Sequence, residues 1–343
     1  MALSESDICI AILNWNGRHH LQEFLPSVTN NSGQARIRII DNASTDDSVS
    51  WLKSNFPEIE IDVLDQNYGF TGGYNRGISR ISSALVILLN SDVEVRKDWL
   101  TALLSEMNSD PGLAACQPKI LSLKEPDHFE YAGAAGGFLD VLGYPFCRGR
   151  IFEQCEKDAG QYQSAIPVFW ASGACMMVRK NAYVETGGLE EAFFAHMEEI
   201  DLCWRFWHRG LKVKAVPASE VLHLGAGTLS KENPRKTFLN FRNGLAMLYI
   251  NTFGWKTSGI LFTRLLLDGL AGLQFLLKGR PESCMAIIRA HIAFYAKFGY
   301  WQKKRSFNKS MKMKEIPPDI LLRGSIVLQF FLRGRKHFRD LRF

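Results

Sequence analysis

The sequence lacks the cysteine patterns that stabilise small secreted proteins or hold zinc. Its seven cysteines are scattered at positions 9, 116, 147, 155, 175, 203 and 284, the number is odd, and no CxxC pair occurs. Scattered single cysteines argue against a disulfide framework and against a zinc site built from thiolates. We therefore expect reduced, cytosolic thiols that mostly fill the core.

The sequence also lacks signals for export. It opens with MALSESDICIAIL, which places acidic residues before a short apolar run, the reverse of a secretory leader. That run is too short to cross a bilayer. The 343 residues contain no internal repeat or low-complexity tract, and 46% of them are hydrophobic. We therefore expect one large core, or one domain with an appendage.

Acidic residues are scarce near the C-terminus. Residues 251–343 hold 18 Lys and Arg against 5 Asp and Glu, a balance of +13. Because the whole chain carries +6, residues 1–250 carry −7. An acidic body with a basic end favours an anionic partner, either a membrane surface or a nucleic acid. The sequence has no nucleic-acid recognition motif, so we expect no nucleic-acid partner.

Strand-like and helix-like patterns alternate through the first hundred residues. Short apolar runs separated by stretches of helical spacing lie at 8–15, 36–42, 59–67 and 84–92. This alternation predicts an α/β fold with a mostly parallel central sheet covered by helices on both faces. Further along, the patterns predict short strands and loops over 112–170, a helix over 189–210 and a strand over 211–217.

Polar side chains gather where the predicted strands end. Asp41 ends the second strand, and Asn90 and Asp92 follow the fourth. In sheets of this kind the ligand crevice lies beyond the carboxyl ends of the strands. Asn90 and Asp92 are two residues apart, so both can face one object, and Mg²⁺ or Mn²⁺ takes such oxygen ligands together with substrate phosphates. Helix capping by Ser91 and Asp92 explains the same residues equally well.

The segment NYGFTGGYNRG at 67–77 holds four glycines. Such a loop lets backbone N–H groups approach a phosphate at the start of a helix. It matches neither GxGxxG nor GxxxxGK[ST], so it indicates neither a dinucleotide fingerprint nor a P-loop.

The segment HMEEID at 196–201 places Glu198, Glu199 and Asp201 among aromatic residues. A carboxylate against an apolar wall can act as a general base, because burial raises its pKa. The alternative is a set of solvated acids favoured by the helix dipole. His223, in VLHLGAGT at 221–228, is a candidate metal or phosphate ligand or a structural histidine.

Taken in order, these motifs resemble the family 2 inverting glycosyltransferases, which have the GT-A fold. The likeness is greatest to the rhamnosyltransferase-like branch that builds cell-surface polysaccharides, and it covers about residues 7–250. It depends on the segments ILNWNG, IIDNASTDDS, NYGFTGGYNRGI, LLNSDVEV, WASGACMMVRK, GGLEEAFFAHMEEIDLCWRFWHRG, HLGAGT and FRN at 241–243.

The resemblance implies a donor site for a nucleotide-sugar. It makes Asp41 the residue that reads the base and places Asn67, Gly69 and Asn75 in the nucleotide pocket. Asn90 and Asp92 match the family's DxD, which holds Mg²⁺ or Mn²⁺ and the donor diphosphate, with Asp92 as the metal ligand. His223 matches a later histidine that joins the metal and the diphosphate.

The resemblance also implies an acceptor side. Trp170 and Gly173 match the segment that shapes the acceptor site, and Glu198 and Glu199 match a Glu-Asp pair that contains the catalytic base. Glu199 stands where the family usually has Asp, and Asn90 departs from the first Asp of DxD. We prefer Glu199 as the base and keep Glu198 as the alternative. The substitution at 199 also leaves open a catalytically degenerate partner protein that only binds nucleotide-sugars.

The expected organisation is a GT-A catalytic domain over 1–250 and a basic, helical C-terminal region over 251–343. The acceptor implied by the resemblance is a glycan or a lipid-linked sugar. The segments 259–279 and 318–343 are apolar but interrupted by charges, so they predict amphipathic helices lying on a membrane. A helical subdomain packed on the core is the alternative. The membrane interpretation places the protein in the cytoplasm, peripheral on the inner face of a bacterial cell membrane.

Overall fold

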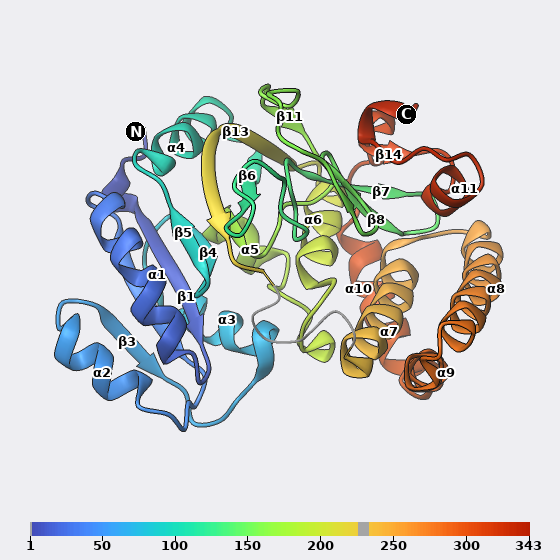
Figure 1. Cartoon of the computed structure of the whole chain (residues 1–343), viewed down its shortest axis with the longest axis horizontal. Coiled ribbons are helices and arrows are strands. Elements are labelled where there is room, and N and C mark those ends of the chain that lie inside the picture. The colour runs from blue at the N-terminus through green and yellow to red at the C-terminus, as the bar shows by residue number, and fades with distance from the viewer. Residues whose placement is uncertain (1, 226–232) are drawn as a thin grey trace.

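The computed structural model describes residues 2–225 and 233–343, with an α/β body on one side and C-terminal helices on the other (Figure 1). The predicted strand–helix alternation is confirmed in the first hundred residues. Four parallel strands lie in the order β4 (Leu85–Asn90), β1 (Ile8–Asn14), β2 (Arg36–Asp41) and β3 (Glu60–Val63). Their connections are α1 (Arg18–Asn31), α2 (Ser48–Asn55) and α3 (Gly69–Arg80), and a 3₁₀ turn, η1 (Glu5–Asp7), precedes β1.

The predicted mostly parallel sheet is confirmed, and its few antiparallel strands lie in the other half. β12 (Cys175–Arg179) runs antiparallel between β4 and β6 (Leu113–Ser122). The chain returns to the sheet beside the end of β4, where Cys175 pairs with Leu89, so β12 must run backwards. β13 (Lys212–His223) is parallel to β6 and carries two short antiparallel partners, β5 (Val93–Val95) and β11 (Ile166–Pro167).

A second, smaller sheet fills the region predicted to hold loops and short strands. Its strands are β10 (Gln154–Cys155), β9 (Arg150–Ile151), β8 (Pro145–Cys147), β7 (Gly137–Asp140) and β14 (Leu321–Leu322). β14 comes from the C-terminal region and pairs in parallel with β7. The C-terminal region is therefore joined to the middle of the chain through this sheet (Figure 1).

Both faces of the large sheet are buried, which explains its almost wholly apolar strands. Ile8, Ile10 and Ile12 of β1 point to one face, where they meet α1, α2 and α4 (Trp99–Ser109). Cys9 and Ala11 point to the other face, toward α3, α5 (Lys180–Glu185) and α6 (Glu198–His208). All seven cysteines are free and five are buried, as expected of core residues.

The C-terminal region forms helices that pack on the body. They are α7 (Pro234–Asn251), α8 (Lys256–Leu277), α9 (Pro281–Ala296), α10 (Phe298–Met311) and α11 (Ile326–Phe331), with the 3₁₀ turns η3 (Pro318–Ile320) and η4 (Phe338–Asp340). α7 begins at Pro234 after the cap residue Asn233, whose side chain accepts the N–H of Arg235. α9 and α10 both contact α7, and α10 also contacts the body directly, because Tyr300 and Lys304 both reach Glu190.

The last residues do not form the amphipathic membrane helix predicted over 318–343. Phe338 packs against Phe138, Phe146 and Tyr162 of the small sheet region, and its N–H donates to Glu156. Asp140 accepts the N–H of Ile326. This tail has partners on the body because its apolar residues complete the small sheet.

Candidate active site

Asp41 lies at the carboxyl end of β2 and is fully buried. Its carboxylate accepts hydrogen bonds from the Asn14 side chain, at 2.9 Å, and from the N–H of Ser44, also at 2.9 Å. Asn14 is its neighbour in the β1–β2 register, so two polar residues meet where two parallel strands end. Asp46 has a different task, because its carboxylate accepts the N–H and hydroxyl of Ser48 and caps the start of α2.

The glycine-rich segment closes over the same edge of the sheet. The side-chain oxygen of Asn67 accepts from Asn42, at 3.0 Å, and from the N–H of Gly69, at 2.8 Å. Gly69 has φ +70°, and a Cβ there would lie 2.5 Å from the ring of Phe194. Only glycine allows the start of α3 to press so closely against the chain that leads to α6.

Asn75, the third residue expected in the nucleotide pocket, is used within the fold. Its amide group donates to the carbonyl of Leu189, at 2.9 Å, and its oxygen accepts from Tyr183, at 2.6 Å, and from the N–H of Leu189. These bonds join α3 to the loop between α5 and α6. These hydrogen bonds indicate that Asn75 positions that loop.

Asp92 and His223 meet at the end of the large sheet. Asp92 Oδ1 lies 3.1 Å from His223 Nε2, and both side chains are buried. His223 lies next to Asp92 because the last residues of β13 pair with β5, where His223 is opposite Val93. Asn90 is close by, with its amide nitrogen 3.5 Å from the same imidazole nitrogen.

Glu130 stands on the other side of the imidazole and was not found from the sequence. Its Oε2 lies 3.1 Å from His223 Nδ1, so the ring is held between two buried carboxylates. Burial opposes the charge on His223, but the contacts with Asp92 and Glu130 outweigh it and raise the pKa of His223 to about 10. Burial also opposes ionisation of the two acids, yet the histidine holds the pKa of each below its ordinary value.

The donor set of Asp92 and His223 fits a divalent cation that replaces the proton held on the imidazole by the two carboxylates, because only the neutral ring can bind a metal. A carboxylate oxygen and an imidazole nitrogen lie within 3.1 Å of each other, and the carboxylate of Glu130 contacts the remote ring nitrogen, as is usual for a metal-bound histidine. Among the described residues no group of three or more His, Cys, Asp or Glu forms a metal cage. Two protein ligands suit an ion that takes its other ligands from water and substrate phosphates.

The chain before α6 is held in an unusual backbone shape. Phe194, His196 and Met197 all have positive φ, between 68° and 73°, which is rare for residues with side chains. The predicted helix over 189–210 is therefore broken, and α6 starts only at Glu198. Asn243 of the FRN segment fixes this shape, because its buried amide group donates to the carbonyls of Phe193, Ala195 and His196.

Glu198 and Glu199 occupy the first turn of α6. Neither Oε2 atom has a hydrogen-bond partner within residues 2–225 and 233–343, although both atoms are buried. Burial raises the pKa of Glu199 to about 7, and burial together with the charge of Glu199 raises that of Glu198 well above its ordinary value. Asp201 differs, because Arg205 and Asn251 donate to its carboxylate.

Short contacts connect these groups into one site. The ring of Phe194 touches the Cα of Gly69, and the Phe194 carbonyl accepts the N–H of Phe70. A Cβ at Gly173 would lie 3.9 Å from the Cβ of Glu199, while the next residue, Ala174, accepts the N–H of Asn90. The glutamates, the glycine-rich loop and the end of β4 therefore border the same region.

Comparison with known proteins decides the family. The sequence profile of glycosyl transferase family 2 matches residues 8–187, more than half of the chain. The protein belongs to this family. The matched stretch contains Asp41, Asp92 and Gly173, and it ends before the first turn of α6.

Two relatives extend the similarity of this transferase beyond the profile. It is 27% identical over 263 residues to an N-acetylglucosaminyl-diphospho-decaprenol L-rhamnosyltransferase of Mycobacterium tuberculosis, covering 71% of this chain and 84% of the relative. It is 24% identical over 247 residues to the low-salt glycan biosynthesis hexosyltransferase Agl10 of Haloferax volcanii, covering 69% and 74%. The rhamnosyltransferase-like likeness noted in the sequence is thus confirmed.

Solved structures confirm the GT-A-like fold of the transferase. The mannosyltransferase PcManGT of Pyrobaculum calidifontis, in complex with GDP-Man and Mn²⁺, superposes with a TM-score of 0.53 at 12% identity, covering 89% of this chain and 84% of that one. GalNAc-T7 with UDP, GalNAc and Mn²⁺ superposes with a TM-score of 0.57 at 15% identity, covering 71% and 47%.

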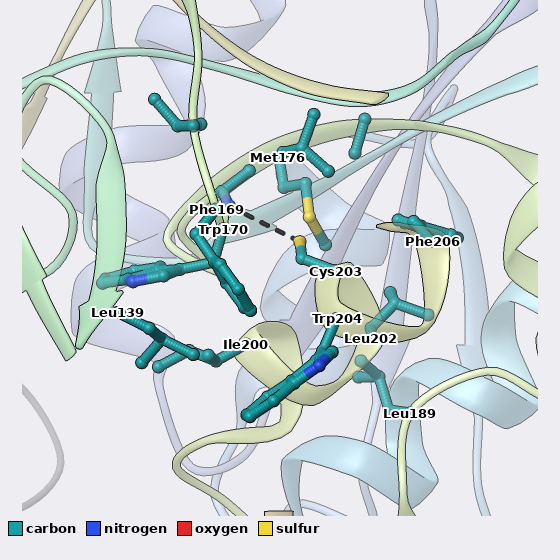
Figure 2. Close-up of a cluster of buried hydrophobic side chains, with 14 of the residues drawn as sticks. Leu139, Phe169, Trp170, Met176, Leu189, Ile200, Leu202, Cys203, Trp204 and Phe206 are labelled. Atoms are coloured by element: carbon teal, nitrogen blue, oxygen red, sulfur yellow. Dashed lines mark hydrogen bonds between the residues drawn. The ribbon is translucent and has the colours of Figure 1, made fainter. Parts of the chain in front are cut away.

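The transferase does not expose Trp170, which the resemblance placed in the acceptor segment. Trp170 is 3% exposed, and its ring nitrogen donates to the carbonyl of Phe138. Figure 2 shows it stacked into the apolar cluster behind α6, with Phe169, Ile200 and Trp204. The tryptophan therefore supports the wall from which the glutamates project, whereas Gly173 leaves space directly beside Glu199.

Of the HLGAGT segment, His223 to Gly225 are described and residues 226–228 lie outside the described residues. Glu130 escaped the sequence analysis because it belongs to an irregular region and no motif surrounds it. The only available signal was a single acid between Phe129 and Tyr131, which is also common in ordinary loops.

Proposed function

We propose that this family 2 transferase moves a sugar from a nucleotide-diphosphate-sugar to an acceptor hydroxyl, with inversion at the anomeric carbon. The observation that carries the proposal is the carboxylate of Glu199, whose buried Oε2 has no partner among residues 2–225 and 233–343 and whose pKa burial raises to about 7. A carboxylate with such a pKa accepts a proton near neutral pH without being neutralised by a cation. Glu198, more deeply buried, is the alternative base.

The donor would lie across the carboxyl edge of the sheet. Asp41 supplies an acceptor for the nucleotide base, and Asn67 and Gly69 shape the loop around the nucleotide. Asp92 and His223 would hold Mg²⁺ or Mn²⁺, with Asn90 beside them; when bound, the ion supplies Lewis-acid stabilisation of the charge that develops on the diphosphate. Two solved structures of this fold contain Mn²⁺ and nucleotide ligands, which supports this arrangement.

The protein's own residues would perform the proton transfer. Glu199 removes the proton from the acceptor hydroxyl as its oxygen forms a bond to the anomeric carbon. The bond from that carbon to the diphosphate oxygen breaks on the opposite side, and the nucleoside diphosphate leaves with the electron pair. Gly173 leaves room for the acceptor because it has no side chain facing Glu199.

The relatives suggest the substrates. An L-rhamnosyltransferase that acts on a decaprenol-linked sugar favours a rhamnose donor and a glycan or lipid-linked acceptor in cell-surface polysaccharide synthesis. A lipid-linked acceptor and the basic C-terminal region together favour a cytoplasmic protein bound peripherally to the inner face of the cell membrane.

Replacing Asp92 by alanine tests the donor site. We expect Asp92→Ala to fold but to lose transfer and metal-dependent nucleotide binding, with a lower melting temperature because the buried His223 keeps only Glu130 as a counter-charge. The measurement is the thermal shift produced by nucleotide-sugars with and without Mn²⁺, because a ligand that binds only the folded state raises its stability. Asp319→Ala, at an exposed position, is the matched control.

Metal-dependent binding at wild-type strength in Asp92→Ala would contradict the donor site. Release of free sugar from the donor by the wild type in the presence of Mn²⁺ separates an enzyme from a partner protein that only binds nucleotide-sugars. Nucleotide binding without any turnover would favour the latter.

A further inference from the structure

Helix α8 buries polar residues and exposes apolar ones, which is the reverse of a surface helix in a soluble protein. Its buried face carries Thr257, Arg264, Asp268 and Gly272. Its exposed face carries leucines at helical spacing, among them Leu266 (56% exposed), Leu270 (62%), Leu273 (52%) and Leu277 (82%). A surface helix of a soluble protein normally turns its apolar stripe to the core and its charges to water.

The two buried charged residues of α8 contact each other and neighbouring segments. Asp268 accepts from Tyr144 at 3.1 Å, lies 3.0 Å from His291 of α9, and lies 3.5 Å from the guanidinium of Arg264. Arg264 also donates to the carbonyl of Leu142 and stacks over the Tyr144 ring. This network fixes the rotation of α8, so the leucines cannot turn inward.

Helix α9 extends the apolar face. Its exposed residues include Met285, Ile288, Ile292 and Tyr295. Figure 1 shows α8 and α9 together at the edge of the molecule farthest from β1 to β3. Residues scattered singly need no explanation, but a contiguous apolar face of two helices indicates a partner.

Cations surround this face. Exposed Lys256, Lys278, Arg289 and Lys297 lie on or beside the two helices, against one exposed acid, Glu282. Trp255, 85% exposed, stands at the start of α8. Basic residues and an aromatic at the border of an apolar stripe are typical of helices that lie in the interface of an anionic membrane.

We propose that the outer face of the α8–α9 pair, defined by the exposed apolar residues above, inserts into the interfacial layer of an anionic lipid bilayer. In the described part of the chain α8 is the one helix long and apolar enough to cross a membrane. Its polar side is packed on α9 and the β7–β8 turn, so lipid can reach only the other side, and the helix lies along the surface. The contact coincides with the segment 259–279, which the sequence predicts to lie on a membrane, and does not involve the other predicted segment, 318–343.

Vesicle flotation with the full-length chain tests this surface. The vesicles contain equal parts of phosphatidylglycerol and phosphatidylethanolamine, at low and high salt. We expect Leu270→Ser/Leu273→Ser to weaken partitioning by on the order of tenfold or more, because the leucines no longer leave water. Val63→Ser/Val184→Ser, at two equally exposed positions on the α/β body, should bind like wild type.

Fluorescence supplies a second measurement that does not depend on a polar substitution. Lipids brominated near the headgroup should quench tryptophan emission of the wild type, and Trp255→Phe should remove most of that quenching. High salt should reduce binding only in part, because the apolar contact is not screened. Vesicle binding needs neither donor nor acceptor, so its failure would leave the proposed reaction intact.

Three results would overturn the proposal. The first is equal partitioning of wild type and the double leucine variant, and the second is quenching that is unchanged in Trp255→Phe. The third is a wild-type dimer that ignores vesicles and becomes monomeric in the double variant, which would assign the face to a second copy of the chain.

Discussion

The first two residues of α6 and the middle of α8 both carry carboxylates with buried oxygens, but these oxygens have partners in α8 and lack them at the start of α6. Asp268 contacts Tyr144, His291 and Arg264. Glu198 and Glu199 each keep one buried oxygen with no partner in the described part of the chain. A buried acid is normally paired because an unpaired charge in the interior is costly. In these two helices we therefore expect the paired acid to hold the fold and the unpaired acids to serve the reaction.

Asp201 shows how local this distinction is. It lies two residues beyond Glu199 on the same helix, yet Arg205 and Asn251 satisfy its carboxylate. The acids of HMEEID thus divide into one that holds the fold and two that face the site.

Removing the partnered acid should have the largest effect on stability. Asp268→Ala leaves the guanidinium of Arg264 buried without its counter-charge, and breaking a buried ion pair in this way typically destabilises by about 3–5 kcal/mol. We expect a clear fall in the midpoint of thermal unfolding, whereas Glu198→Gln should not lower it. Equal midpoints for the two variants would show that pairing does not separate these acids.

Removing the unpartnered acid should instead remove activity. Glu199→Gln is nearly isosteric but cannot take a proton, so we expect transfer to fall by on the order of 10²-fold or more while donor binding remains. Steady-state kinetics and donor thermal shifts measure the two properties separately. Near-normal transfer in Glu199→Gln together with an inactive Glu198→Gln would assign the base to Glu198, and two active variants would place the base elsewhere.

The same variant carries a pH signature. The pKa of Glu199 is raised by burial from 4.5 to about 7, so the folded chain holds this proton where the unfolded chain has lost it. Stability from this group is therefore present below about 4.5 and is lost as pH rises toward 7. As the pH rises from about 4.5 to about 7, the melting temperature of Glu199→Gln should therefore increase relative to that of the wild type. The rate of transfer by the wild type should rise as the pH passes about 7, because the base then loses its proton.

The smallest of these effects concerns Glu130, which contacts the remote nitrogen of His223. Glu130→Gln should weaken Mn²⁺ binding by about 10–100-fold, the usual cost of losing the carboxylate behind a metal-bound histidine. Titration of Mn²⁺ into the ligand-free protein measures it. Glu156→Gln is the matched control, because Glu156 is also buried but binds Tyr162 and Phe338. Unchanged affinity in Glu130→Gln would remove that glutamate from the metal site.

Sequence patterns within short segments correctly predicted the strands and helices of the first hundred residues. β1 to β4 and the helices between them follow from apolar runs separated by polar loops. The ends of β2 and β4 place Asp41, Asn90 and Asp92 at the carboxyl edge of the sheet. The sequence could not foresee β12, whose direction depends on where the small sheet returns the chain. It also missed the break before α6, since nothing about Phe194, His196 or Met197 favours positive φ.

Contacts between distant segments escaped the sequence for the same reason. Glu130 meets His223 only because the irregular region folds over the end of β13. Arg264 and Asp268 look like interruptions of an apolar helix, and only their partners reveal that they face inward. The basic tail suggested a membrane segment by composition, but β14 and Phe338 tie it to the small sheet.

Asn243 has a consequence for how the protein matures during synthesis. The glutamates leave the ribosome well before Asn243, which arrives with α7. Until α7 docks, the carbonyls of Phe193, Ala195 and His196 lack the amide that holds their strained backbone. A nascent chain that lacks α7 therefore also lacks the contact that holds the backbone before Glu198 and Glu199, so we expect the first turn of α6 to reach its final position only after α7 has docked.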